Sequence, residues 1–440
     1  MFRPILKRVK CSISAQGGEE FLYFSGISIA SYASVSNMLL GYSVYLESGI
    51  FGAIIVFLIS CSALYTTSLA LLRASIPNCF TSLDVVYHYF GRQGARLCAV
   101  VLALMFLGWF LWQLGFLVHF IKNYATTRIP ILDIFSDEKI GVSVGLLCCA
   151  FACTEKVGLR IISIVFVPIL LFLLLCMFFF IPFDFKTPVV KLSTVDFSAL
   201  SILCSSLVTL IMFSPTFFQT ASSIDVVKRS IKFTYLFLLP FFYISGVIFG
   251  IYSPSNNILN LAMLPHGIGP FILILYISVC VLNIGSTDLL YGADVVQQVT
   301  SSKTKMPVIF LLSSIGVLFF GLVNSSVDEG LRYVEALGSI VGGMLAIVLT
   351  KIIAGNYQIL PENLMQQHGN YFALLTAYCV GLLVLCGMFK LTGVPFFDVA
   401  LTAVIVTLYN MKNPQKLEFL SRTIERSTKR SKTEKQEKQR

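Results

Sequence analysis

The chain has 440 residues, of which 56% are hydrophobic and 12% are charged, and its formal net charge is +10. Long apolar runs recur throughout, which excludes an ordinary soluble domain and is typical of a polytopic helical membrane protein. The excess charge gathers at the C-terminal end and requires no nucleic-acid partner. The twelve cysteines lie mostly inside apolar runs and predict packing rather than a metal site or a disulfide framework.

Twelve membrane spans can be drawn, because about 20 helical residues cross a hydrocarbon core of roughly 30 Å. They run over 21–43, 49–73, 97–121, 140–157, 160–182, 198–220, 232–252, 270–292, 306–324, 333–354, 372–390 and 393–409. The first sixteen residues are polar and basic and lack the apolar core of a cleavable signal. The sequence therefore predicts an all-α, multi-pass protein of the cell membrane.

Lysine and arginine set the orientation of such a protein, since basic residues favour the cytoplasmic side. An even number of spans places both termini on one side, and most of the 32 Lys and Arg residues fall there. Among the basic residues outside the tail, about twice as many lie on this side as on the other. We expect both termini to be cytoplasmic. The tail 413–440 is basic and polar, which predicts a solvated extension.

The first span is rich in small and hydroxyl residues, among them Ser31 and Ser34, with Asn37 about two-thirds of the way through it. Such a helix either packs very closely against its neighbours or is partly unwound, exposing backbone groups to a buried site. The sixth span carries a comparable interruption at Phe213-Ser214-Pro215-Thr216, because proline removes a backbone donor. Two interrupted spans, five apart, indicate an inverted-repeat transporter.

The third span contains Trp109 and Trp112, the only tryptophans of the chain, and Gln113. Trp109 and Gln113 are i,i+4 neighbours on one helix face. An indole and an amide at mid-membrane depth could stack on a flat ring and bond its edge. The alternative is that the indoles fill helix packing and Gln113 bonds a neighbouring helix.

The eighth span carries Ser286, Thr287 and Asp288. An acid inside a span is a functional candidate by default, and adjacent hydroxyls are hard ligands for an alkali cation. The alternative is a hydrogen-bonded helix end near the membrane face. The sequence contains no Walker A loop, no His-Glu-x-x-His and no Gly-x-Ser-x-Gly, which argues against an ATP-driven pump and a common membrane hydrolase.

Short motifs in several spans give the chain a family resemblance. They are Phe90-Gly91-Arg92-Gln93-Gly94, Trp109-x-x-x-Gln113, Leu282-Asn283-Ile284-Gly285-Ser286-Thr287, Leu290-Tyr291 and Val341-Gly342-Gly343. With these motifs the chain resembles the nucleobase:cation symporter family, the group of cytosine permeases and hydantoin transporters. Three features depart from the family pattern. Asn37-Met38 and Ser214-Pro215 stand where cytosine permeases carry Gly-Gly, and only Asp288 remains of their longer polar run after the paired hydroxyls. An altered substrate pocket is therefore expected.

The resemblance implies a five-plus-five inverted repeat with two extra helices. The segments would be a cytoplasmic head 1–20, repeats 21–182 and 198–354, the helices 372–409 and the tail. The substrate would lie between spans 1, 3, 6 and 8. Coupling sodium would be held by backbone carbonyls of span 1, around Ser31 and Ser34, and by the Ser286 and Thr287 hydroxyls.

We therefore expect a secondary-active importer of a small planar heterocycle, working as a monomer by alternating access, without a cofactor. Trp109 would stack on the ring, and Gln113 and Asp288 would bond its edge. Asn37, Phe213 and Ser214 complete the expected substrate site, with Phe213 as an opposite wall. Sodium is favoured as the coupling ion, and a proton carried by Asp288 is the alternative. Two other classes stay open: an amino-acid carrier, or a membrane-embedded enzyme or sensor.

Overall fold

The computed structural model is all-helical over the residues it describes. These residues are 17–32, 35–125, 134–180, 197–251, 268–300, 304–319, 327–355, 364–386, 388, 391–392 and 394–412. The helices, in chain order, are α1 (Gly17–Tyr32), α2 (Val35–Ser75), η1 (Ile76–Asn78), α3 (Ser82–Phe120), η2 (Ile121–Ala125), α4 (Asp137–Cys153), α5 (Lys156–Ile161), η4 (Ile162–Phe166), α6 (Val167–Phe180), α7 (Phe197–Phe218), α8 (Ile224–Phe233), η5 (Thr234–Leu238), α9 (Leu239–Ile251), α10 (Gly269–Thr300), α11 (Met306–Phe319), α12 (Val327–Ala354), α13 (Leu364–Leu385) and α14 (Pro395–Lys412). The basic tail and Ser34 lie outside this range.

Every predicted span coincides with a helical segment of the described chain. Within that chain, six helices are long and apolar enough to cross a membrane by themselves, and shorter apolar helices supply further spans. Many of the large apolar side chains on these helices are exposed, as expected of surfaces that face lipid. The prediction of an all-α polytopic membrane fold is confirmed.

Two of the longest helices bend sharply at a glycine. Gly49 in α2 and Gly91 in α3 both have φ of 64°, a backbone conformation that L residues with a side chain rarely adopt. The bend at Gly49 divides α2, so residues 35–48 complete the first span and residues 50–75 form the second. The bend at Gly91 divides α3 as well: residues 82–90 form a first limb that begins at a Thr81–Asp84 capping box, and residues 92–120 contain the third span.

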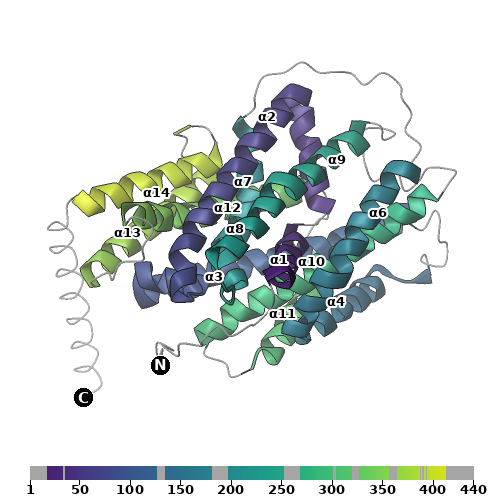
Figure 1. Cartoon of the computed structure of the whole chain (residues 1–440), viewed down its shortest axis with the longest axis horizontal. Helices are drawn as coiled ribbons and strands as arrows, with labels where there is room; N and C mark the ends of the chain where they lie inside the picture. Colours follow the sequence, from purple (N-terminus) through teal and green to yellow (C-terminus); the bar gives the residue numbers. More distant parts are fainter. Residues whose placement is uncertain are drawn as a thin grey trace.

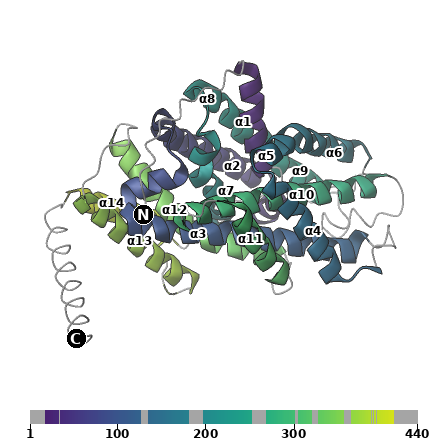
Figure 2. The ribbon, with the colours of Figure 1, turned by 90° about the horizontal axis from the view of Figure 1, so that it is seen from below.

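The described part of the first span consists of two helices. α1 ends at Tyr32 and α2 begins at Val35, and the two residues between them lie outside the described residues. In Figure 2, α1 stands upright at the edge of the bundle, at an angle to the long central helices. Val35 to Asn37 already belong to α2, and Ser34 lies outside the described residues, so the break predicted for span 1 stays a prediction.

The break predicted for the sixth span is wrong. α7 continues as an α-helix through Ser214, Pro215 and Thr216 to Phe218. Pro215 cannot donate a backbone hydrogen bond to the carbonyl of Ile211, four residues earlier. The Ser214 hydroxyl donates to that carbonyl instead, at 2.7 Å, so the carbonyl that the proline leaves free keeps a hydrogen bond.

The helices pack around a centre formed by α3, α7 and α10. α3 packs along α10, and α2 contacts α7 and α9. α1 rests on α8 and η4. Figure 1 shows α13 and α14 at one end of the long axis, where they pack against each other and against α12, and α4 and α6 at the opposite end. The centre is therefore enclosed on all sides by other helices.

Candidate functional site

A pocket opens at the centre of the bundle, beside the end of α1 and the start of α2. It encloses about 490 Å³ of space not filled by protein atoms, its opening included. Its walls come from α1, α2, α3, α7 and α10. The lining residues are Ser31, Asn37, Phe106, Trp109, Gln113, Ser206, Leu207, Thr209, Leu210, Ile284, Thr287 and Asp288.

The end of α1 forms one wall of this pocket. A helix leaves its last carbonyl groups without partners, and here two asparagine amides bond them. Asn37 of α2 donates to the carbonyl of Tyr32, and Asn283 of α10 donates to the carbonyl of Ala30 at 2.7 Å. The end of α1 is thus held to α2 and α10 by these two amide hydrogen bonds.

The wall from α3 is aromatic with one amide. Trp109 is partly buried and lies edge-on to Trp112, with ring centroids 5.6 Å apart. Gln113, one turn beyond Trp109, is 3% exposed. Trp112 faces away, into a second apolar cluster of α3 with α2, α6, α9 and α10. Trp109 and Gln113 therefore share the pocket face, as their spacing predicts, whereas Trp112 serves packing.

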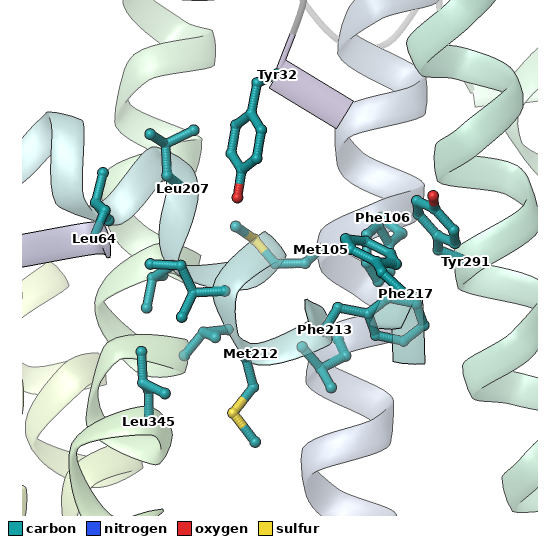
Figure 3. Packing of buried hydrophobic residues seen from close by; sticks show 14 of the residues in the cluster. Tyr32, Leu64, Met105, Phe106, Leu207, Met212, Phe213, Phe217, Tyr291 and Leu345 are labelled. Atoms are coloured by element: carbon teal, nitrogen blue, oxygen red, sulfur yellow. The ribbon is translucent and has the colours of Figure 1, made fainter. Parts of the chain in front are cut away.

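An aromatic cluster closes the pocket toward the end of the bundle at which α1 begins. Its members are Phe106, Phe213, Phe217 and Tyr291, with ring centroids 4.6 to 5.8 Å apart. Figure 3 shows these rings gathered side by side. Phe106 alone among them reaches the pocket. Phe213 is fully buried behind Phe106 and does not form the expected opposite wall.

The wall from α10 carries the carboxyl group. Asp288 is 6% exposed and Thr287 is 2% exposed, and both line the pocket. The Thr287 hydroxyl donates to the carbonyl of Ile284 at 2.8 Å. Ser286 does not line the pocket: its hydroxyl donates to the carbonyl of Leu282 at 2.6 Å and lies beside the thiol of Cys148 on α4.

Three polar atoms of the pocket residues are buried without a hydrogen-bond partner. They are Nε2 of Gln113, Oγ1 of Thr209 and Oδ2 of Asp288. They come from three different helices, α3, α7 and α10. A buried polar group without a partner costs about 1–3 kcal/mol, so such groups on one pocket predict a polar ligand that bonds them. Together with the Trp109 and Phe106 rings, they suit a flat molecule with a hydrogen-bonding perimeter.

Most of the predicted site residues meet at this pocket. Ser31, Asn37, Trp109, Gln113, Thr287 and Asp288 line it; Phe213, Ser214 and Ser286 do not, and Ser34 is outside the described residues. Sequence reasoning missed Phe106, which lies one turn before Trp109 on the same helix face, and Ser206 and Thr209 of α7. The run of hydroxyl residues in the sixth span was the sequence signal for Ser206 and Thr209. The prediction instead centred on Pro215, further along the same helix.

The fold matches several solved transporter structures. Mhp1, a nucleobase-cation-symport-1 family transporter, in a closed conformation with bromovinylhydantoin bound, has a TM-score of 0.68 and 13% identity over 90% of this chain and 92% of its own. A substrate-bound, outward-open Na⁺-coupled sialic acid symporter has a TM-score of 0.59 and 15% identity over 88% and 89%. A manganese transporter variant of Eremococcus coleocola has a TM-score of 0.59 and 9% identity over 92% and 97%.

These likenesses establish the fold, which is that of Mhp1 and includes the expected repeat architecture with its additional helices. At 9–15% identity they say nothing further about this chain. No protein-family model matches the sequence, and no curated protein matches it. What the chain binds must therefore be argued from its own pocket.

Proposed function

We propose that this protein is a secondary-active transporter that imports a small planar heterocycle, a nucleobase or a related compound, by alternating access. The observation that carries the proposal is the pocket itself. An indole, an amide and a carboxyl group lie together at the centre of a membrane fold, beside the end of α1 and the start of α2. The Gln113 amide and the Asp288 carboxyl each keep one buried polar atom unpaired.

The roles follow from the chemistry of each group. Trp109 offers a flat face on which a ring stacks. Gln113 offers an N–H donor to a ring carbonyl or ring nitrogen, and Asp288 offers oxygen to a ring N–H or amino group. Asn37 lies on the first turn of α2 and donates a hydrogen bond to the end of α1. Its role in the site is therefore to hold the end of α1 against the start of α2. The nearly complete burial of Gln113 and Asp288 limits competition from water for their hydrogen bonds.

The transported ring would move with a coupling cation, sodium or a proton. For sodium, Ser31 and Thr287 both line the pocket. Each hydroxyl donates its hydrogen to a backbone carbonyl of its own helix, so its oxygen lone pairs are available to a cation. The carbonyls of Ala30 and Tyr32 already accept amide hydrogens. The donor set is therefore smaller than expected from sequence, because Ser286 lies against α4. A proton would use Asp288.

A second candidate is a cation-coupled carrier of amino acids. α2 begins beside the pocket, and a helix N-terminus binds carboxylate groups, while Asp288 could hold an amine. The described pocket lining contains no Lys, Arg or His, which fits an uncharged ring better. We also propose that the protein acts as a monomer in the cell membrane, with both termini cytoplasmic and repeats over 21–182 and 198–354.

Uptake into proteoliposomes tests the function directly. Labelled cytosine, uracil, hypoxanthine, hydantoin and a set of amino acids would be offered under an inward sodium gradient, an inward proton gradient or neither. Accumulation of a ring compound with one of the gradients supports the proposal. Accumulation of amino acids alone selects the second candidate, and no accumulation of any compound removes both.

A further inference from the structure

The two halves of the chain contribute differently to the pocket. In the first half, α1 ends and α2 begins at the pocket. In the second half α7 is unbroken, because the Ser214 hydroxyl bonds the carbonyl that Pro215 leaves free. An unbroken helix has no free backbone groups to offer a ligand. Any polar contact from α7 must therefore come from a side chain.

The hydroxyl groups that line the pocket differ in what they bond. Ser31, Ser206 and Thr287 each donate to a carbonyl of their own helix, at 3.2, 2.8 and 2.8 Å. This is the usual way in which a serine or threonine inside a membrane helix is satisfied. Thr209 is the exception, since its Oγ1 is buried and has no partner, and its side chain is only 1% exposed.

We propose that Thr209 is a specificity-determining residue for the transported compound. Its hydroxyl donates to an acceptor atom on the edge of the ring that faces α7. The inference rests on the proposed function and deepens it. The substrate class becomes a ring with polar atoms on three sides: one toward Gln113 of α3, one toward Asp288 of α10 and one toward Thr209. A ring with a single polar edge would leave one of these groups buried and unpaired, and would bind worse for that reason.

The test compares two ligands that differ in one edge. The first is the base that binds best among cytosine, uracil and hypoxanthine. The second is 2-pyridone, which keeps one adjacent N–H and C=O pair and has carbon at the remaining ring positions. Binding of both is measured by isothermal titration to the purified, full-length protein and to the variants.

Thr209→Val removes the hydroxyl and keeps the branched shape. We expect it to weaken binding of the base by about three- to tenfold, the range of one neutral hydrogen bond, and to leave binding of 2-pyridone unchanged. Thr209→Ser keeps a hydroxyl and is expected to retain most of the affinity for the base. The selectivity between the two rings therefore falls in the valine variant only.

Ser205→Ala is the matched control. Ser205 lies one turn before Thr209 on the same helix. Its hydroxyl is also fully buried and has no hydrogen-bond partner. It does not line the pocket, and its backbone carbonyl lies against Gly338 of α12. Loss of this hydroxyl should leave the affinity for both rings unchanged.

The outcomes separate this inference from the proposed function. If the wild-type protein binds and transports none of the bases, the proposed function itself fails. If the wild-type protein binds a base and Thr209→Val binds both rings as tightly as wild type does, the role of Thr209 is overturned while the function stands. An equal loss for both rings in Thr209→Val also overturns it, because it shows a general effect on packing.

Discussion

Glu20, near the start of α1, accepts two hydrogen bonds from Ser222 in the turn between α7 and α8. The donors are the backbone N–H, at 2.6 Å, and the hydroxyl, at 2.5 Å. The Glu20 side chain is 5% exposed. One turn further along α1, Phe24 packs on Phe218 at the end of α7, with ring centroids 5.4 Å apart. The N-terminal end of α1 is thus attached to the second half of the chain.

Removing this fastening should loosen α1. Hydrogen bonds to a charged group contribute about 1.5–3 kcal/mol each, so Glu20→Ala is expected to lower the thermal stability of the purified protein. It should also raise the rate at which a cysteine placed at Ser25, buried on α1, reacts with a maleimide. Glu20→Gln keeps one acceptor oxygen and should lie between the two. Equal labelling rates in all three proteins would show that the contact does not hold α1.

Ser214 and Pro215 offer a double-mutant cycle. Ser214→Ala should destabilise the protein by about 0.5–1.5 kcal/mol, because the Ile211 carbonyl loses its hydrogen bond. Pro215→Ala restores a backbone N–H four residues after Ile211, so Ser214→Ala should cost clearly less in that background. Denaturation midpoints of the four proteins measure the coupling. Strict additivity would mean that the hydroxyl does not replace the missing donor.

Trp109→Ala should abolish binding of a planar substrate while the protein still folds. Stacking contributes roughly 0.5–1.5 kcal/mol beyond the burial of the ring, so the total loss of affinity should exceed tenfold. Trp109→Phe keeps a smaller ring and should retain part of the binding. Titration of the purified variants checks this, with circular dichroism as the control for folding. Uptake at the wild-type rate by the alanine variant would remove Trp109 from the site.

The coupling ion can be assigned by uptake at constant pH with and without sodium. Sodium coupling predicts a requirement for Na⁺ and a collapse of uptake in Thr287→Ala. Ser286→Ala should be milder than Thr287→Ala, because Ser286 lies against Cys148 rather than in the pocket. Uptake that persists without sodium, follows an imposed pH gradient and fails only in Asp288→Asn would assign the coupling to a proton at Asp288.

Gly246 in α9 lies directly against the backbone of Met38 in the first limb of α2, and a Cβ there would overlap the Met38 carbonyl. Backbone cannot move aside as a side chain can, so Gly246→Ala should strongly reduce the yield of folded protein. The control is Gly292→Ala in α10, where the new Cβ would meet only side-chain atoms, at 3.3 and 3.4 Å. Fluorescence-detected size exclusion compares the two, and a normal profile for Gly246→Ala would contradict the close contact.

The sequence by itself determined the helical class, the spans and much of the pocket. An apolar run of about 20 residues forms a helix in lipid, because every backbone polar group must then be hydrogen-bonded within the segment. Polar residues inside such a span are energetically costly and are therefore functional candidates. For this reason Trp109-x-x-x-Gln113 and Asp288 could be predicted as site residues from the sequence. The helical repeat put Trp109 and Gln113 on one face without any knowledge of the neighbours.

Only the tertiary structure decided which polar groups are free to bind a ligand. A proline predicts a break when it is read alone, yet the hydroxyl of Ser214 keeps α7 whole. Ser286 and Thr287 are adjacent in sequence, but successive helical residues point about 100° apart, so one faces α4 and the other the pocket. Thr209 carries no motif, and it differs from the other hydroxyls of the pocket only because its own helix leaves it unbonded. Hydrogen-bond partners depend on what packs nearby, and that is a property of the assembled bundle.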